Sequence, residues 1–481
     1  MTHRLPIIIA AGLLLAACGA AAPAPTSAPM PMATRPTAPT APLPTAAPPP
    51  PASGSQPAAA RLVYNVPADG SLRAFDLGAN TEIVLGDPTA AQQILPWSPS
   101  PDGRIIALVT GRGWGVKGPD DGWTAALWAV QSDGSQPRKL LDLLPTGGAG
   151  SSVATSDLRT ALTTLQQPVW TPDGAAIIVA SAHEGQVDLY TVAPNGGQVR
   201  RLTNSPAMET RLSLAPDGRA LAFVSTTGFG TGGGWANIEA AAVPLGGGQP
   251  RDLLAPAGRL PPAGAEVLGW TQAGAAMVAA YSPEPAVTVT LTGPASGPEV
   301  IYQGLGSGLA WDAASEQLAI IAGDLAQPAN GAALRIWRPG QPAPATAARL
   351  PAVAAPHWAP GGQALLLCAD RHDPPQLTLW AGGALKALGK AACADLAWSA
   401  QGQVAVSSED QPGLVAAPDG RPLGTLPPGA VLAGWRGAEL YSVRHDERRR
   451  WQLMWRTAHE EAPIPLPVEQ RPEAVKLVPG P

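Results

Sequence analysis

The chain is poor in charge, histidine and cysteine. Only 14% of its 481 residues are Asp, Glu, Lys or Arg, against about 25% in a typical soluble domain. The formal net charge is −5 and no basic stripe is present, which speaks against a nucleic-acid partner. Three cysteines and six histidines form no Cys-x-x-Cys or His-x-x-x-His pair, so the sequence predicts no metal and no cofactor.

Motifs of common enzymes are also missing. The chain contains no Gly-x-Ser-x-Gly elbow, no P-loop and no dinucleotide-binding fingerprint, which are the signatures of large classes of hydrolases, nucleotidases and dehydrogenases. We therefore expect the protein not to be an enzyme. A cryptic hydrolase or lyase that uses carboxylates around a central channel remains an alternative.

What the chain does contain is a phrase that recurs every 40 to 50 residues or so, the mark of a repeat architecture. Three copies are sharp: Trp97-Ser-Pro-Ser-Pro-Asp102-Gly103, Trp170-Thr-Pro-Asp173-Gly174 and Leu214-Ala-Pro-Asp217-Gly218. Five worn copies begin at Trp270, Trp311, Trp358, Trp398 and Trp435.

The phrase predicts a tight turn between two strands. Proline presets φ at the first turn position, and glycine takes the left-handed position that follows aspartate. Short apolar runs such as Ile105–Val109, Ile177–Ala180 and Leu221–Val224 come next, as expected for strands buried on both faces. Two further strands complete each unit. Four antiparallel strands, repeated radially, predict an all-β fold of the β-propeller class.

The combination of Trp-Ser/Thr-Pro-Asp-Gly with a following apolar strand resembles the repeat of TolB-type propellers, which belong to the WD40-like repeats known as PD40. The resemblance covers roughly residues 61 to 470. It implies a binding scaffold, usually outside the cytoplasm. It brings no catalytic residue, because the matching positions are turn and core positions.

The number of blades is harder to predict. Besides the eight copies of the phrase, residues 62–85 contain strands two, three and four of a unit that lacks strand one. The tail segment Ala474–Val478 could supply that strand. Since propellers usually have four to eight blades, we predict eight, with seven and nine left open.

The N-terminus predicts export and lipid attachment. A basic Met1–Arg4, an apolar stretch and Leu15-Ala-Ala-Cys18 resemble the signal peptide and lipobox of a bacterial lipoprotein. We expect residues 1–17 to be removed and Cys18 to be lipidated, with an ordinary signal peptide as the alternative. Residues 18–60, rich in Pro, Ala and Thr, then form a disordered tether, and residues 61–481 form the propeller. The protein would thus be anchored to the cell membrane or envelope, facing outside the cytoplasm.

Two cysteines remain after Cys18. In an oxidising compartment, Cys368 and Cys393 would form a disulfide, since both fall where connections emerge on one face of the propeller. Two buried thiols are one alternative. A metal site is the other, with Cys368, Asp370, His372 and Asp373 as ligands, although no second cluster completes a coordination shell.

Long insertions point to a functional surface. They fall between strands two and three or between strand four and the next blade, and both slots open on one face. Their glycine-flanked aromatic and charged residues are candidate contacts: Trp114, Lys117, Asp120, Asp121, Trp123, Phe229 and Trp235. Alternatively, these rings fold back over their own blades.

Loops on a rigid scaffold often carry binding. The sequence therefore predicts a membrane-tethered module outside the cytoplasm that presents its loop-rich face to an envelope protein partner. A receptor for a small molecule or glycan, using the Trp-bearing loops and the central channel, is the alternative.

Overall fold

The protein is described by a computed structural model. The described residues are 60–66, 70–86, 92–112, 124–144, 167–205, 207–226, 238–254, 263–282, 286–323, 331–369, 376–391, 393, 395–446, 450–456, 461–466 and 471–478. The chain divides into two units, Met1–Pro57 and Ala58–Pro481, and all described residues belong to the second. Within these residues, no helix has the length and apolar character needed to cross a membrane.

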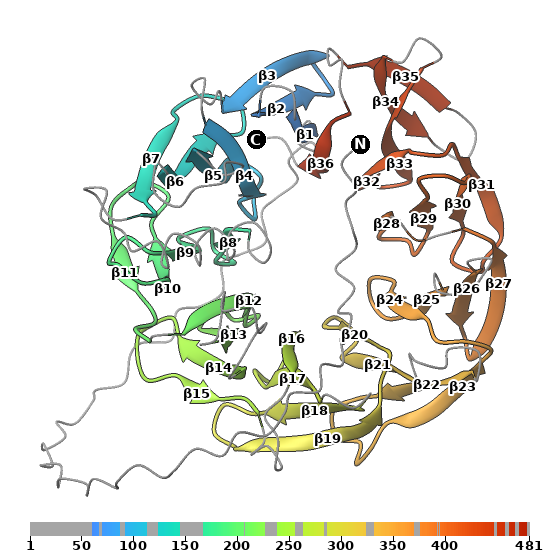
Figure 1. Cartoon of the computed structure of the whole chain (residues 1–481). Coiled ribbons are helices and arrows are strands. Elements are labelled where there is room, and N and C mark those ends of the chain that lie inside the picture. Colours follow the sequence, from blue (N-terminus) through green and yellow to red (C-terminus); the bar gives the residue numbers. More distant parts are fainter. Residues whose placement is uncertain are drawn as a thin grey trace, which may run out of the picture. The chain divides into compact units, whose positions relative to one another are not determined.

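Within the described residues, nine antiparallel four-stranded sheets follow one another around a ring (Figure 1). Named from the inner to the outer strand, the first blade is β36 (Glu473–Val478), β1 (Arg61–Val66), β2 (Ser71–Asp76) and β3 (Thr81–Gly86). The second is β4 (Gln92–Pro99), β5 (Ile105–Arg112), β6 (Thr124–Gln131) and β7 (Arg138–Asp142). The third is β8 (Val169–Trp170), β9 (Ile177–Ser181), β10 (Asp188–Val192) and β11 (Val199–Arg201). The fourth is β12 (Met208–Leu214), β13 (Ala220–Thr226), β14 (Glu239–Pro244) and β15 (Arg251–Asp252).

The remaining blades repeat this plan. The fifth is β16 (Gly264–Trp270), β17 (Ala276–Tyr281), β18 (Ala286–Thr292) and β19 (Pro298–Leu305). The sixth is β20 (Gly308–Asp312), β21 (Gln317–Ala322), β22 (Ala332–Trp337) and β23 (Ala345–Leu350), and the seventh is β24 (Ala355–Trp358), β25 (Ala364–Ala369), β26 (Gln376–Ala381) and β27 (Ala384–Gly389). The eighth is β28 (Asp395–Trp398), β29 (Val404–Ser407), β30 (Gly413–Ala416) and β31 (Pro422–Leu426), and the ninth is β32 (Val431–Arg436), β33 (Glu439–His445), β34 (Trp451–Arg456) and β35 (Glu461–Pro465).

The predicted β-propeller class is confirmed, and the described residues form nine blades, a number that was left open, rather than the favoured eight. The reason is that a degenerate copy of the phrase can still form the tight turn between its two strands. At the copy that begins with Trp311, which lacks both proline and glycine, Asp312 accepts the backbone N–H of Ser315 at 2.9 Å. Glu316 takes the positive φ of 51° that glycine occupies elsewhere. The blade therefore forms without the full phrase.

The ring closes with strands from both ends of its sequence. β36 pairs antiparallel with β1, with Arg61 opposite Val478 and Leu62 opposite Leu477. The predicted role of the tail as the missing first strand is thus confirmed. The first blade in Figure 1 accordingly combines blue strands with the red β36.

The sharp phrases make the turns that their residues predict. Gly103, Gly174 and Gly218 have φ of 71°, 68° and 67°. Asp173 accepts the backbone N–H of Ala175 at 3.0 Å and the hydroxyl of Thr171 at 2.7 Å. These bonds hold the pKa of the Asp173 carboxyl below its usual range, because they stabilise its charged form.

The core lies between neighbouring sheets. Second strands are the most buried elements, as their apolar runs predict: every residue of Ile177–Ser181 is buried, as is every residue of Leu221–Thr226. The largest cluster joins the second, third and fourth blades through side chains such as Leu127, Leu189 and Phe223.

Tryptophans of the phrase connect adjacent blades. Each indole Nε1 donates to a backbone carbonyl of the preceding inner strand: Trp170 to Ser98, Trp270 to Ser213, Trp311 to Trp270, Trp358 to Ala310 and Trp435 to Ala397, at 3.0–3.2 Å. Trp97 donates instead to the Asn65 side chain at 2.7 Å. Trp398 is the exception among the described copies, because its Nε1 is buried without an acceptor.

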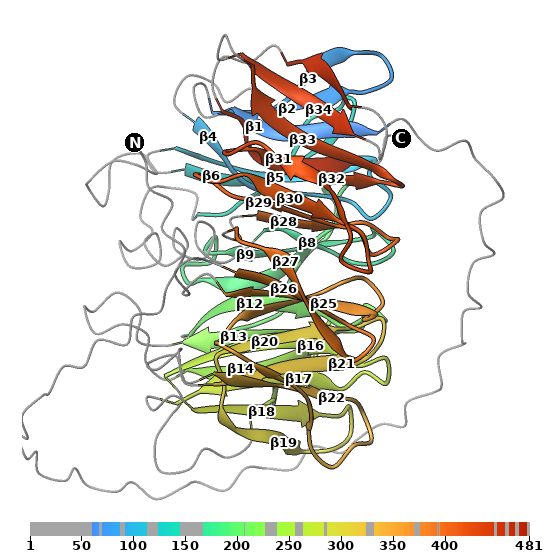
Figure 2. The ribbon, with the colours of Figure 1, turned by 90° about the vertical axis from the view of Figure 1, so that its right-hand side faces the viewer.

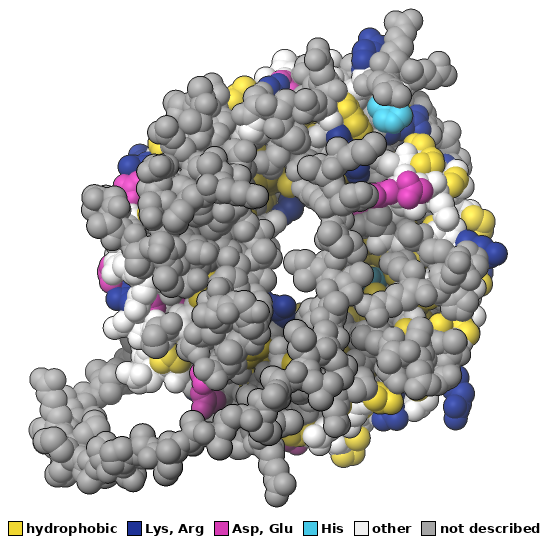
Figure 3. Space-filling view, in the orientation of Figure 1, with side chains coloured by type: hydrophobic (Ala, Val, Ile, Leu, Met, Phe, Trp, Pro, Cys, Tyr) yellow, Lys and Arg dark blue, Asp and Glu magenta, His cyan; other side chains and the backbone are white. Residues whose placement is uncertain are grey.

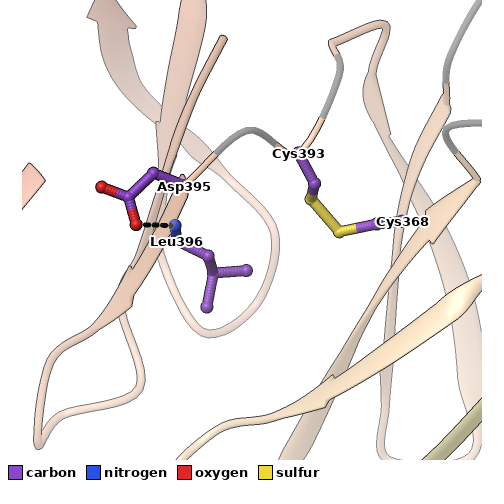
Figure 4. Close-up of a disulfide and its surroundings, with 4 residues drawn as sticks. All are labelled: Cys368, Cys393, Asp395 and Leu396. Carbon is purple, nitrogen blue, oxygen red and sulfur yellow. Dashed lines mark hydrogen bonds between the residues drawn. A yellow bond between two sulfur atoms is a disulfide. The ribbon is translucent and has the colours of Figure 1, made fainter. Parts of the chain in front are cut away.

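The sulfurs of Cys368 and Cys393 are joined in a disulfide (Figure 4). Cys368 belongs to β25, and Cys393 lies in the connection that leads to β28. Asp395, two residues further on, accepts the backbone N–H of Leu432 in the ninth blade at 3.2 Å. The bridge and this bond tie the seventh, eighth and ninth blades together. Of the alternative metal ligands, Asp370, His372 and Asp373 lie outside the described residues.

Candidate functional site

The two faces of the ring carry different connections. Strands run across the ring in alternating directions (Figure 2). Connections from second to third strands, and from each fourth strand to the next blade, therefore leave on one face, which we call the loop face. Hairpins between first and second strands and between third and fourth strands lie on the opposite face, the turn face. On the face seen in Figure 3, the described charged side chains lie mainly along the outer rim.

Longer connections fall on the loop face. β5 ends at Arg112 and β6 begins at Thr124, whereas on the turn face Trp170 and Ile177 bound a short hairpin. Another long connection joins β13 to β14, and a third joins β7 to β8. These spans carry the predicted contact residues Trp114, Lys117, Asp120, Asp121, Trp123, Phe229 and Trp235, which, like the predicted lipidation site Cys18, lie outside the described residues.

Beneath the loop face, a buried ionic cluster lies at the junction of the third and fourth blades. Asp188 at the start of β10 is fully buried, and its carboxylate pairs with the Arg201 guanidinium of β11. Arg201 also binds Glu184 at 2.7 Å and donates through Nε to the carbonyl of Thr203 at 2.8 Å. Asp188 further accepts the backbone N–H of Ser205 at 3.2 Å. A buried carboxylate with this many donors fixes the local backbone.

Glu209 of β12 extends the cluster into the fourth blade. It is 1% exposed, and its Oε1 accepts the Ser205 hydroxyl at 2.9 Å, but its Oε2 has no partner among the residues that the structure describes. Burial, reinforced by the nearby negative charge of Asp188, raises the pKa of Glu209 to about 8. Glu209 is therefore mostly protonated at neutral pH, because its environment disfavours the charged form.

Tyr190 and His183 complete the cluster. The Tyr190 side chain is 1% exposed and its hydroxyl has no hydrogen-bond partner. Burial raises the pKa of Tyr190 to about 12. The His183 ring packs against the Tyr190 ring with centroids 4.4 Å apart, and burial lowers the pKa of His183. A neutral imidazole on a neutral phenol suits a packed interface rather than a charged pair.

One pair in this cluster has the geometry of a nucleophile and a base. The Ser181 hydroxyl lies 3.0 Å from His183 Nδ1. Ser181 is fully buried, however, and also bonds to the carbonyl of Leu143 at 3.3 Å. Since a nucleophile must reach its substrate, we assign the pair a structural role.

None of the cluster residues was singled out from the sequence. Asp188 and Arg201 stand 13 positions apart on neighbouring strands, and Glu209 stands in a Met-Glu-Thr-Arg run that reads as an ordinary strand. Pairing of β10 with β11 brings Asp188 and Arg201 together, and the packing of the third blade against the fourth adds Glu209. The arrangement gives the loop face a fixed base from which the connections on both sides emerge.

No protein-family model matches the chain. A stretch of 62 residues, 13% of the chain, is 34% identical to the Tol-Pal system protein TolB of Francisella tularensis subsp. tularensis and covers 14% of that protein. Among solved structures, TolB from Acinetobacter baumannii is similar at 14% identity with a TM-score of 0.32, over 67% of this chain and 76% of that one. Porphyromonas gingivalis dipeptidyl peptidase 4 is similar at 12% identity with a TM-score of 0.47, over 83% of this chain and 64% of that one.

The part of the chain that the structure describes is a nine-bladed β-propeller. One stretch of 62 residues is similar in sequence to a TolB protein, in keeping with the resemblance seen in the repeat. Because the matched stretch spans only 14% of the TolB protein of Francisella tularensis, the likeness concerns the repeat and the fold.

Proposed function

We propose that the protein is a membrane-tethered scaffold outside the cytoplasm that presents the loop face of its propeller to a protein partner of the cell envelope. It acts by binding rather than by catalysis. The observation that carries the proposal is the unequal distribution of connections, with the long spans 113–123, 145–166 and 227–237 all leaving from the loop face.

The buried cluster supports this proposal. Asp188 and Arg201 order the strand ends between the connections 145–166 and 227–237, and an ordered base lowers the conformational entropy lost on binding. The aromatic residues of these spans, such as Trp123 and Trp235, are of the type that dominates the energetics of protein interfaces. The TolB-type repeat and the lipobox around Cys18 favour the envelope as the place of action.

The test is affinity capture with the full-length protein, carrying a C-terminal tag and extracted from native membranes with mild detergent. Three forms are compared: the wild type, the double variant Trp114→Ala/Trp235→Ala, and Arg421→Ala on the turn face. The proposal predicts one protein retained by the wild type and by Arg421→Ala but lost with the double variant. Equal retention by all three forms, or a partner lost only with Arg421→Ala, would contradict it.

A glycan or small-molecule ligand is separated from this proposal by a melting experiment. If a glycan raises the melting temperature of the wild type but not of the double variant, the loops act as a receptor for that glycan, and the scaffold proposal fails in its present form.

A further inference from the structure

The turns of neighbouring blades touch one another along the turn face. A Cβ on Gly218 of the fourth blade would lie 3.0 Å from Pro172 of the third blade. The backbone N–H of Gln272 in the fifth blade donates to Glu316 of the sixth blade at 2.7 Å. Gln317 of the sixth blade bonds to the carbonyl of Gly362 in the seventh blade at 3.3 Å. Adjacent hairpins are thus packed together at these junctions.

The junction between the fourth and fifth blades, like that between the seventh and eighth, lacks such a contact at the turn glycine. Gly274, the turn glycine of the fifth blade, has Pro294 of its own blade as its nearest neighbour, at 3.5 Å from a built Cβ, and no described atom of the fourth blade within 4 Å. A pocket of about 360 Å³ opens between the two blades at this place. This volume lies at the lower end of the roughly 300–1,000 Å³ that small-ligand pockets occupy.

Apolar side chains form much of the pocket lining. Trp270, which is 3% exposed, lines the pocket together with Ala215 and Ala242, and we call these three buried residues its floor. Pro216 and Pro294 also line it. The indole N–H of Trp270 is already bonded to the carbonyl of Ser213, so the floor offers hydrocarbon surface without an unmet polar group. Such a floor suits an aliphatic side chain.

The rim of the pocket is polar and carries an excess of positive charge. Arg219 and Arg251 line it together with Asp217. The Asp217 carboxylate accepts the backbone N–H of Arg219 at 2.9 Å, and within the described residues no carboxylate pairs with either guanidinium. Burial lowers the pKa of Arg251. An anionic ligand would supply the missing counter-charge.

The fifth blade also holds the Arg251 side chain in place. Its Nη1 donates to the carbonyl of Gly293 in the fifth blade, so the guanidinium spans the junction and leaves its other nitrogens for a ligand. Gln249 and Gln272 lie on the same rim, and their amide groups can both donate to and accept from a peptide backbone.

We propose that this pocket binds the C-terminal residue of a peptide, with Arg219 and Arg251 facing the carboxylate and the Trp270 floor receiving the side chain. A chain end fits better than an internal segment because the pocket is small and its charge excess calls for a carboxylate. The site lies on the turn face, so it is separate from the loop face of the proposed scaffold function, and either can fail without the other.

The test uses the full-length protein and the peptide N-acetyl-Ala-Ala-Leu, as the free acid and as the C-terminal amide, in saturation-transfer NMR titrations. We expect the free acid to bind at least about tenfold more tightly than the amide, because a hydrogen bond to a charged group is worth more than one to a neutral group. N-acetyl-leucine, which lacks the preceding peptide bonds, should bind more weakly than the peptide. Equal binding of acid and amide, or no binding of the acid, would overturn the proposal.

Variants locate the site. Arg251→Gln and Arg219→Gln should each weaken binding of the free acid several-fold and leave binding of the amide unchanged. The matched control is Arg104→Gln, because Arg104 follows Pro-Asp-Gly in the second blade as Arg219 does in the fourth, and it should have no effect. Because Arg219 is exposed, Arg219→Gln should leave folding intact, so it tests the site even if Arg251→Gln perturbs folding. If Arg104→Gln weakens binding of the free acid to the same extent, the attraction is a non-specific effect of charge, and the assignment is overturned.

If N-acetyl-leucine binds as tightly as the peptide, the ligand is a free carboxylate, and the peptide assignment is wrong.

Discussion

The indole Nε1 of Trp311 donates a hydrogen bond to the backbone carbonyl oxygen of Trp270, 3.1 Å away, across the junction of the fifth and sixth blades. The same indole packs onto Gly269, where an added Cβ would lie only 2.6 Å from the ring. The tryptophan of the repeat thus connects blades, in addition to filling the core. Its counterparts repeat the bond at most of the described junctions.

Loss of such a bond has a measurable cost. Trp311→Phe keeps an aromatic ring but leaves the Trp270 carbonyl without its donor. Trp398→Phe is the matched control, because the Trp398 indole N–H has no acceptor. We expect Trp311→Phe to lower the free energy of unfolding by about 1 kcal/mol more than Trp398→Phe does, the net worth of one hydrogen bond. Denaturant unfolding of both variants measures the difference, and equal losses would show that the bond contributes nothing.

The disulfide should stabilise the propeller. Cys368 and Cys393 are separated by 25 positions, for which the chain-entropy model gives about 3 kcal/mol. We expect a reductant to lower the melting temperature of the wild type. The double variant Cys368→Ala/Cys393→Ala should melt at the lower temperature with or without reductant. A wild type that is insensitive to reductant while its disulfide is demonstrably reduced would refute this role.

Glu209 should make stability depend on pH. Its pKa is about 8 in the folded protein and near 4.5 when unperturbed. Between these values the unfolded chain loses its proton while the folded protein keeps it, so the free energy of unfolding falls as pH rises, by up to about 1.4 kcal/mol per pH unit. Glu209→Gln removes this group from titration.

Thermal unfolding at pH 5, 6.5 and 8 checks this prediction. The stability of Glu209→Gln relative to the wild type should rise steadily across the series. The control Glu299→Gln changes an exposed carboxylate, and its stability should change with pH in the same way as that of the wild type. If the stability of Glu209→Gln also changes with pH as that of the wild type does, Glu209 is ionised in the folded protein at neutral pH, and the effect assigned to its burial is wrong.

Cys18 provides a test of the membrane tether. If Cys18 carries the lipid, Cys18→Ser should move the protein from the membrane fraction to the soluble fraction of the cell envelope, because the anchoring acyl chains are lost. Mass spectrometry of the wild-type N-terminal peptide should show acyl groups on Cys18. An unmodified wild type with the same fractionation as Cys18→Ser would point to an ordinary signal peptide.

Much of the fold could be predicted from local sequence. Pro-Asp-Gly fixes its own turn, as at Asp173 and Gly174, and the short apolar run that follows, rich in strand-forming residues, predicts a buried strand. The closing strand at 474–478 could be predicted because a ring has no place for an unpaired β1. The blade number could not be settled from the sequence. The turn at Asp312 and Glu316 forms although the proline and glycine of the full phrase are missing, and the residue types alone do not predict its backbone geometry.

The buried cluster and the turn-face pocket could not be predicted for a different reason. Asp188 and Arg201 meet across the β10–β11 pair, but Glu209 joins them only because the third and fourth blades pack at a particular offset, and that offset depends on all the side chains between them. The pocket beside Arg251 opens at the junction of the fourth and fifth blades, so it depends on how the two blades pack and not on the sequence of either repeat alone.

The most direct test of the scaffold proposal is photo-crosslinking in living cells from one position on each face. A crosslinking residue replaces Asn204, which is exposed in the connection from β11 to β12 on the loop face, or Ala313, which is exposed in the β20–β21 hairpin on the turn face. The account predicts a discrete crosslinked protein of the envelope from position 204 and none of the same mass from position 313. The same product from both positions, or a product from position 313 alone, would contradict the claim that the loop face carries the partner.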